Sequence, residues 1–347
     1  MNKLHVFVLL SALTALTACT GSGTPATPTA SGSATATPTP SATIPVSSSL
    51  DAITVTGKAL KDPKIKFTAP FAIDKTRVKV LSEGDGPEVQ ADGYVSVWYK
   101  GVDGRTGAEF DSSYEYTVTT TPTADTASPS ATPTPEVQTY EGQAVSFSLD
   151  GVITGFKTGL TGQKVGSRVL IAMPGSDAYD ASGGNSSDGI NVGDTLIFVC
   201  DIVGASLAGP QGKAVTPKAG LPTVTDKGEE APEVTIPKTD PPSAMEAQVL
   251  IEGTGAEVAL DDNILTHYVT YSWKTGEQIE SKYDAVDAGV LNTAIPGWQT
   301  GLKGKKIGSR VLLVLPPEDG FPNGSNDPPL EAGDTIVYVV DLLGKAD

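Results

Sequence analysis

The sequence predicts an α+β fold built from two related domains, each an antiparallel sheet packed against one short helix. Three observations predict it: the chain contains an internal repeat, most of its apolar patterns are typical of strands, and each copy has a single helical spacing. A length of 347 residues suits two domains, because one domain commonly holds roughly 100–200 residues.

The internal repeat covers most of the chain. The sequence at 166–170 (GSRVL) recurs unchanged at 308–312, and the sequence at 193–195 (GDT) recurs at 333–335. Similar matches in the same order precede both pairs. Because each copy has the size of a whole domain, the repeat indicates domain duplication, whereas a solenoid would need several shorter units.

Composition sets the expected domain boundaries. We expect the first domain over 51–206 and the second over 231–347, with 207–230 as a linker. The first copy is longer because it contains an insertion at about 119–139, which is rich in Thr, Pro, Ser and Ala. Such a low-complexity segment cannot bury a core, and the second copy lacks it.

Strand-like patterns dominate each copy. Val95, Val97 and Tyr99 recur at every second position, which is typical of a strand with one buried face. The apolar runs at 169–173 and 195–203 are continuous, as in strands that are buried on both faces. Turns rich in Gly and Asp separate these segments, which favours antiparallel strand connections.

Each copy contains one helical spacing. Apolar residues recur at i, i+3 and i+7 at Ile153, Phe156 and Leu160, and again at Ile295, Trp298 and Leu302. Gly155 and Gly159 lie within the first of these segments and lower its helix propensity. We therefore expect a helix of only two or three turns in each domain.

The N-terminus has the layout of an export signal over 1–19. Lys3 precedes an apolar stretch that is too short to span a bilayer, which needs roughly 20 residues. The stretch ends in Leu-Thr-Ala-Cys19, which resembles a bacterial lipobox and implies that Cys19 carries a lipid. An ordinary signal with a chance cysteine is the alternative. Residues 20–50 have no charged side chain and are expected to be a tether on the outer face of a bacterial cell membrane.

Composition also excludes several kinds of chemistry. A net charge of −17 argues against a nucleic-acid partner, which would need a basic surface. After removal of the signal only His267 remains, which leaves little room for a Ser-His-Asp triad or a metal site with several histidines. Cys200 lies in an apolar run and is expected to be a buried, inert thiol. Nothing in the sequence indicates a cofactor.

The first copy contains five short motifs in order along the chain: Val97-Trp-Tyr-Lys-Gly101, Phe110-Asp-Ser-Ser113, Val152-Ile-Thr-Gly-Phe156, Ala178-Tyr179 and Asp194-Thr-Leu-Ile-Phe198. Together they resemble the FK506-binding protein family of peptidyl-prolyl cis-trans isomerases. The resemblance covers about 78–205 and 245–344. It implies a curved five-stranded antiparallel sheet wrapped around a short helix, and an enzyme that acts on proline-containing polypeptides.

The resemblance also implies a pocket in the first copy, with Phe156 as its floor. Asp111, Tyr179 and the backbone N–H of Ile153 would orient the peptide. The apolar wall would be formed by Tyr99, Phe110, Val145, Phe147, Val152, Ile153, Phe156, Ile190 and Phe198. Phe156 stands where the family often has Trp and Val145 where it usually has Phe, so reduced activity or altered specificity is expected. Taken singly, each aromatic residue also fits a purely structural core.

The second copy departs further from the family pattern. It keeps Tyr268, Ile295 and Trp298, but Ile279 replaces Phe110, Glu280 replaces Asp111 and Phe321 replaces Tyr179. The segment that corresponds to Phe147 is ambiguous in the sequence. We therefore expect the second domain to be inactive or weak, and to serve as a binding or spacing domain.

The leading interpretation is an exported prolyl isomerase anchored to the membrane by Cys19. A non-catalytic chaperone or adaptor that binds apolar peptide segments is the alternative, and a structural spacer is a third possibility. The intact motif set of the first copy argues against the spacer.

Overall fold

The computed structural model describes residues 44–114, 116–120, 136–228, 230–326 and 329–346. The expected export signal, Cys19 and most of the expected tether lie outside these residues. Within the described ranges, no helix is both long enough and apolar enough to cross a membrane.

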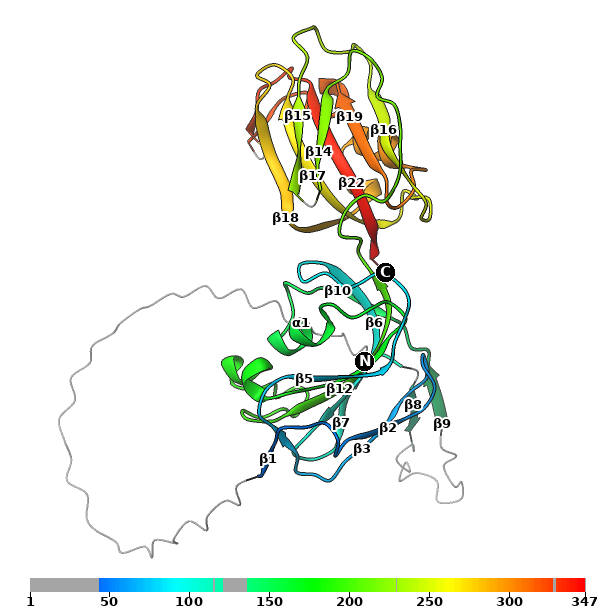
Figure 1. Cartoon of the computed structure of the whole chain (residues 1–347), viewed down its shortest axis with the longest axis vertical. Helices are drawn as coiled ribbons and strands as arrows, with labels where there is room; N and C mark the ends of the chain where they lie inside the picture. Colours follow the sequence, from blue (N-terminus) through cyan, green and yellow to red (C-terminus); the bar gives the residue numbers. More distant parts are fainter. Residues whose placement is uncertain (1–43, 115, 121–135, 229, 327–328, 347) are drawn as a thin grey trace, which may run out of the picture.

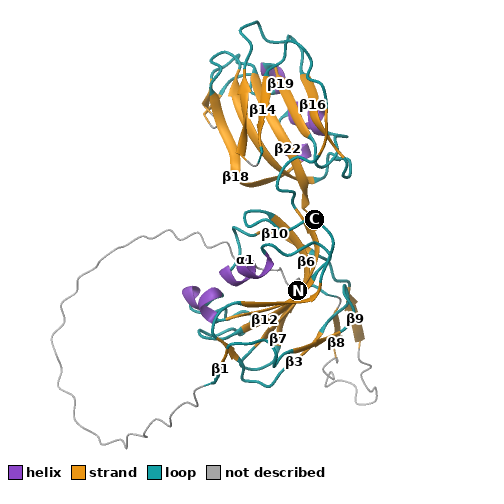
Figure 2. Cartoon of the chain, in the orientation of Figure 1, coloured by secondary structure: helices purple, strands orange, loops and turns teal. Residues whose placement is uncertain are grey.

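The first unit is an antiparallel sheet that curves around helix α1 (Thr154–Leu160), as Figures 1 and 2 show. Two 3-10 turns, η1 (Gly175–Asp177) and η2 (Asp180–Ser182), follow the helix in the chain. The strand order is β10 (Val145–Ser148), β6 (Tyr94–Asp103), β12 (Leu196–Ala205), β11 (Arg168–Met173) and β5 (Arg77–Ser82), and β7 (Glu109–Ser112) also pairs with β6.

The second unit repeats this arrangement around α2 (Pro296–Leu302). Its sheet has the order β13 (Gly212–Ala214), β16 (Glu246–Gly253), β19 (Arg310–Leu315), β22 (Ile336–Ala346), β17 (Asn263–Ser272) and β18 (Gln278–Val290). Shorter elements are η3 (Leu291–Thr293), η4 (Pro317–Asp319), β20 (Ser325–Asn326) and β21 (Pro329–Leu330). Both units are sheets with one short helix, which confirms the predicted α+β fold class.

One long strand of the second unit corresponds to two strands of the first. β18 pairs with β17 along its length, whereas in the first unit β7 and β10 pair separately with β6. The segment between β7 and β10 contains the antiparallel pair β8 (Tyr116–Thr120) and β9 (Glu136–Tyr140). The centre of the expected insertion, 121–135, lies outside the described residues. The ends of the insertion therefore form a β-ladder.

Glycines allow each helix to lie close to its sheet. A Cβ added to Gly155 would lie 2.3 Å from the Met173 sulfur, and one added to Gly159 would lie 2.5 Å from Ile171 Cδ1. Gly297 and Gly301 approach Leu315 and Leu313 equally closely in the second unit. These glycines weaken the helix locally, but they permit helix–sheet contact that a larger residue would prevent.

Both sheets are also covered on the face opposite the helix. In the first unit the cover is the segment before β5, with β1 (Val46–Ser47), β2 (Thr54–Thr56), β3 (Lys64–Lys66) and β4 (Ala72–Ile73). Its buried Leu50, Ile53 and Phe71 pack against Leu170, Val199 and other residues of the sheet. The continuous apolar runs of β11 and β12 follow from this second buried face.

The hairpin of β14 (Thr223–Lys227) and β15 (Glu230–Thr235) covers the second sheet. Leu221 and Val234 of this segment pack with Val269, Leu312 and Val337 of the sheet. Residues 207–230, expected to be a linker, therefore carry β13, which pairs with β16, and β14, which is part of the cover.

A buried ion pair lies on the covered face of each sheet. Arg168 binds Asp201 through two hydrogen bonds of 2.7 and 2.6 Å, and the Tyr114 hydroxyl donates to the same carboxylate at 2.6 Å. Arg310, Asp341 and Tyr283 repeat this arrangement. Each carboxylate is thus satisfied by several donors, as a buried charge requires.

The two units are joined where β12 leaves the first sheet. The Leu207 N–H donates to the Leu343 carbonyl at 2.8 Å, and the Gln211 N–H donates to the Gly308 carbonyl at 2.8 Å. His267 lies at this junction in a small cavity that is also lined by Asp92 and Tyr283. His267 is 7% exposed, and its Nε2 has no hydrogen-bond partner within the described part of the chain.

Candidate active site

The residues expected to form the pocket gather in one cluster between the sheet and α1. Tyr99, Phe147, Phe156, Ile190 and Phe198 are buried in it, and the more exposed members lie at its edge. These edge residues are Phe110, Val145, Val152, Ile153 and Tyr179. The whole set comes from β6, β7, β10, β12, the turn into α1, α1 itself and the loops after η1 and η2, so the fold brings together side chains that are far apart in sequence.

The aromatic rings of the cluster contact one another at steep angles. The Phe156 and Phe198 centroids are 4.6 Å apart with an interplanar angle of 53°, and the Phe110 ring meets Phe198 edge-on at 5.4 Å. Phe147 lies 5.9 Å from Phe156. This packing leaves Phe156 1% exposed at the base and Phe110 partly exposed at the edge, which suits a floor and a rim.

Gly101 on β6 makes room for two of these rings. A Cβ at this position would lie 2.6 Å from Phe110 Cζ and 2.7 Å from Phe198 Cε1. Any larger residue would therefore displace at least one ring. Gly101 ends the motif that begins at Val97, but the sequence does not reveal its role, which depends on where the two rings lie.

A polar rim borders the cluster at Asp111. The Tyr99 hydroxyl donates to Asp111 Oδ2 at 2.5 Å, and the Ser112 N–H donates to Oδ1 at 2.9 Å. Burial raises the pKa of Tyr99, and the neighbouring Asp111 raises it further. Tyr99 therefore stays a neutral donor, and it fixes the carboxylate at the edge of the pocket.

Tyr179 forms the other side of the rim. Burial raises the pKa of its phenol, and the carboxylates of Asp188 and Asp111 raise it further. The side chain is thus a neutral hydroxyl over the whole physiological range. A hydroxyl at the mouth of an apolar pocket is suited to donate a hydrogen bond to a carbonyl group.

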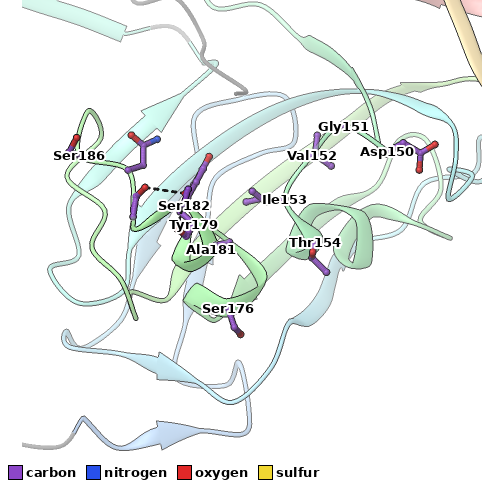
Figure 3. Close-up of a pocket in the computed structure, with 13 residues that line it drawn as sticks. Asp150, Gly151, Val152, Ile153, Thr154, Ser176, Tyr179, Ala181, Ser182 and Ser186 are labelled. Carbon is purple, nitrogen blue, oxygen red and sulfur yellow. Dashed lines mark hydrogen bonds between the residues drawn. The ribbon is translucent and has the colours of Figure 1, made fainter. Parts of the chain in front are cut away.

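A cavity of about 530 Å³ opens beside this rim. Figure 3 shows Val152 and Ile153 on one side of it and Tyr179 on the other, with Ile153 directed toward Tyr179. The opposite wall is the loop over 181–186, which sequence reasoning did not assign to the site. Two features of the sequence pointed to it: the loop directly follows the Ala-Tyr motif, and its length differs between the copies.

The second unit has a related but altered cluster. Tyr268, Trp298 and Tyr338 meet edge-on, with centroid distances of 5.2, 5.4 and 6.0 Å. The Tyr268 hydroxyl lies 3.4 Å from Glu280, compared with 2.5 Å in the Tyr99–Asp111 contact. Ile295 and Phe321 pack at the edge of this cluster, whereas Ile279 is not among its members. Tyr338, which pairs with Thr270 as Phe198 pairs with Gly101, was missed in the sequence.

Strand register resolves the ambiguous segment of the second copy. In the first unit Phe147 pairs with Val95. In the second unit Ile264, which is equivalent to Val95, pairs with Gly289, so Gly289 takes the place of Phe147. By the same register, Asp287 takes the place of Val145. Burial raises the pKa of Asp287, and Glu280 raises it further. The second cluster has thus lost an aromatic wall and gained a carboxylate.

One cysteine, Cys200, belongs to the cluster of the first unit. Cys200 is fully buried, and burial raises the pKa of its thiol, as expected for an inert cysteine. Across the residues that the structure describes, no group of three or more His, Cys, Asp or Glu side chains is placed to hold a metal ion.

Comparison with known proteins identifies the family. A sequence profile of the FKBP-type peptidyl-prolyl cis-trans isomerases matches residues 86–203 and 255–343. A probable FK506-binding protein of Corynebacterium glutamicum is 35% identical over 117 residues, which cover 33% of this chain and 98% of that protein. An FK506-binding protein of Streptomyces anulatus is 34% identical over 147 residues, covering 42% and 98% respectively.

Solved structures give weaker, partial matches. The crystal structure of FkpA from Escherichia coli has 28% identity and a TM-score of 0.27, and the match covers 30% of this chain and 49% of that one. The structure of the three FKBP domains of wheat FKBP73 has 15% identity and a TM-score of 0.32, with 78% and 95% covered. The two profile matches together span more than half of this chain, and each falls on one unit. The chain therefore belongs to the FKBP-type peptidyl-prolyl cis-trans isomerase family and carries two domains of its fold.

Proposed function

We propose that the protein is a lipid-anchored foldase that isomerises X–Pro bonds of exported polypeptides in the pocket of its first domain. The observation that carries the proposal is the cluster of Phe110, Phe156 and Phe198 beside the rim of Asp111 and Tyr179. The second domain would serve as a binding domain or as a spacer, and would not catalyse isomerisation.

The physical basis is the loss of amide resonance in the twisted bond. Rotation about a peptide bond crosses a barrier of roughly 18–20 kcal/mol, and the twisted form has less charge separation than the planar amide. An apolar pocket favours that form over the planar one, because catalysis is stronger binding of the transition state. The hydroxyl of Tyr179 would hold the peptide by its carbonyl while the bond turns.

A protease-coupled prolyl peptide assay tests which domain works. We expect Phe156→Ala to remove most of the activity of the full-length chain, and the matched variant Trp298→Ala to change it little. Because truncating a buried aromatic residue can cost about 3–5 kcal/mol of stability, both variants must first be shown to be folded. Equal losses in two folded variants, or a loss confined to Trp298→Ala, would contradict the assignment.

The anchor is tested separately by metabolic labelling in a bacterium that processes lipoproteins. The motivation is the lipobox-like sequence that ends at Cys19 and the uncharged segment that follows. The wild-type chain should take up labelled fatty acid and Cys19→Ser should not. A wild-type chain that stays unlabelled would rule out lipidation and leave the pocket assignment untouched.

The alternative function is a non-catalytic peptide-binding chaperone. The observation that favours it is the second cluster, where Tyr268, Trp298 and Tyr338 remain but Phe321 replaces the rim hydroxyl. A folded chain that slows aggregation of an unfolded protein, yet leaves prolyl peptides unaffected, would support it.

A further inference from the structure

We propose that the pocket of the second domain binds a cationic side chain, a lysine or arginine of a client polypeptide. The charged group would lie against the Tyr268 and Trp298 rings, beside the carboxylates of Glu280 and Asp287. This assignment rests on the proposed function, in which the second domain serves as a binding domain. Three features of the pocket carry it: its carboxylates, its open side and its aromatic rings.

Strand register places two carboxylates on the pocket face of the second sheet. Asp287 pairs with Thr266, and Glu280 pairs with Thr270. Side chains of directly opposed residues lie on the same face of an antiparallel pair, so the two acids flank Tyr268, which packs in the cluster. The Tyr268 hydroxyl lies 3.4 Å from Glu280 Oε2. Burial raises the pKa of the Tyr268 phenol, and Glu280 and Asp287 raise it further, as expected if both carboxylates lie near this ring.

The side of the pocket next to Asp287 is open. In the first unit the Phe147 ring closes this side, with its centroid 5.9 Å from that of the floor residue Phe156. Gly289 takes the place of Phe147 in the second unit, and a Cβ added to it would meet nothing within 4 Å beyond its chain neighbours. A ligand side chain can therefore approach Trp298, the residue in place of Phe156, from the side that carries the carboxylate.

The aromatic rings of this pocket stand nearly perpendicular to one another. Trp298 meets Tyr268 at 88° and Tyr338 at 87°, with centroids 5.2 and 5.4 Å apart. Tyr268 and Trp298 are both partly exposed. A cation is attracted to the face of an aromatic ring, most strongly to that of Trp, and the attraction grows when water is excluded. The rings therefore suit an ammonium or guanidinium group that the neighbouring carboxylates also attract.

A buried hydroxyl without a partner lies in the same pocket. Thr270 is 0% exposed, and its Oγ1 has no hydrogen-bond partner within the part of the chain that the structure describes. The equivalent position in the first unit is Gly101, where an added Cβ would contact Phe110 and Phe198, so the Thr270 side chain is directed into the pocket. An unpaired buried hydroxyl is unfavourable, and a donor on a bound group would satisfy it. Glu280 lies directly opposite Thr270 in the ladder, so both oxygens border the same space.

The protein itself places an ammonium group beside these carboxylates. Lys282 Nζ lies 3.2 Å from Glu280 Oε1. Burial raises the pKa of Asp287, and the charge of Lys282 opposes that rise. The Lys282 side chain is 47% exposed, and an exposed ion pair of this kind contributes little and exchanges readily. Lys282 therefore shows that the site accepts a cation, and a ligand group that also contacts the rings would displace it.

The test is a titration of the full-length chain, labelled with ¹⁵N-tryptophan, with two peptides that contain no proline. One is an acetylated and amidated alanine-lysine-alanine tripeptide, and the other has norleucine, an uncharged residue of similar length, in place of lysine. The lysine peptide should shift the indole resonance of Trp298 and bind at least about fivefold more tightly than the norleucine peptide. Trp273 lies on the covered face, where its indole N–H donates to the Thr239 carbonyl at 2.9 Å. Its resonance should stay in place and reports that the fold is intact.

Variants that each change one charge locate the site. Glu280→Gln and Asp287→Asn keep the size of the side chain, and each should weaken binding of the lysine peptide by about three- to tenfold. Lys282→Gln removes the internal competitor and should strengthen binding by about two- to threefold. Two matched controls lie outside the pocket: Glu233→Gln on the hairpin that covers the opposite face, and Lys303→Gln at the end of α2. Both should bind the lysine peptide as the wild type does.

Equal affinity for the two peptides, an unmoved Trp298 resonance, or a Lys282→Gln variant that binds the lysine peptide more weakly would overturn the proposal. A loss in Glu233→Gln as large as that in Glu280→Gln would also overturn it, because binding would then follow net charge and not the pocket. A chain that binds neither peptide but turns over prolyl peptides would contradict cation binding and leave the proposed catalysis intact. Conversely, a chain that binds the lysine peptide but has no prolyl turnover would contradict only the proposed catalysis in the first domain.

Discussion

Gly101 is the residue at which the two pockets diverge most clearly. In the first domain its missing Cβ leaves space for Phe110 and Phe198. In the second domain the same position in the ladder is Thr270, which is fully buried, and the residue in place of Phe110 is Ile279. Tyr338 still pairs with this threonine, but the smaller Ile279 stands where the first domain has the Phe110 ring. The size of the residue at this one position on β6 therefore decides whether both aromatic rings fit beside it.

Gly101→Thr should consequently damage the first pocket while leaving the fold in place. Overpacking costs about 1–3 kcal/mol, and a displaced Phe110 should lower kcat/KM by roughly tenfold or more. The double variant Gly101→Thr with Phe110→Ile copies the second domain, and it should regain stability in urea unfolding without regaining activity. If Gly101→Thr alone left kcat/KM unchanged, the positions of the rings beside residue 101 would be irrelevant to turnover.

At this scale the sequence predicted which residues would gather between the sheet and α1, but not the contacts among them. The nominated aromatic residues meet in one cluster because motif order places them on strands that pair. Gly289 and Asp287 were beyond prediction, since a strand register becomes fixed only when both strands are aligned.

At the scale of elements, the segments that cover the outer face of each sheet change the expected boundaries of a stable domain. Leu50 lies just before 51–206 and is buried. In the second domain, β13 and β14 both precede residue 231. These segments carry few apolar residues in a Pro-rich context, so composition alone favoured a linker. Their apolar side chains are nevertheless what closes the second face of the sheet.

A fragment of residues 208–347 should therefore be more stable than one of 231–347. The shorter fragment loses the buried Leu221 and the pairing of β13 with β16, and it leaves Arg310 without Asp226, which lies 3.1 Å away. Burying one Leu side chain contributes about 1.5–3 kcal/mol, so the difference in unfolding free energy should exceed that. Urea unfolding followed by tryptophan fluorescence measures it. Identical midpoints with identical slopes would show that the cover adds nothing.

At the scale of the whole molecule, carboxylates of both domains act on the protonation of His267, which couples the domains at their junction. Burial lowers the pKa of His267, while Asp341 of its own domain and Asp92 of the first domain oppose that shift. The ring also lies 4.9 Å from Tyr283, centroid to centroid. His267 is thus held largely neutral beside the junction where Leu207 meets Leu343. It is also the one histidine that remains if the export signal is removed.

The stability of the second domain should therefore fall as the pH drops below the unfolded histidine pKa of about 6.5. In that range the unfolded chain binds a proton that the folded chain binds less readily, so unfolding is favoured until the lowered folded pKa is also passed. The slope is at most about 1.4 kcal/mol per pH unit. Urea unfolding at pH 7.5 and 5.5 measures the loss, which His267→Gln should reduce. Asp92→Asn should enlarge the loss, because removing this carboxylate lowers the folded pKa further. Burial raises the pKa of Asp287, so its protonation stabilises the folded chain as the pH falls, which is opposite to the effect of His267. Asp287 is present in the wild type and in both variants, so its effect cancels in the comparison. A His267→Gln variant with the same pH dependence as the wild type would contradict the coupling.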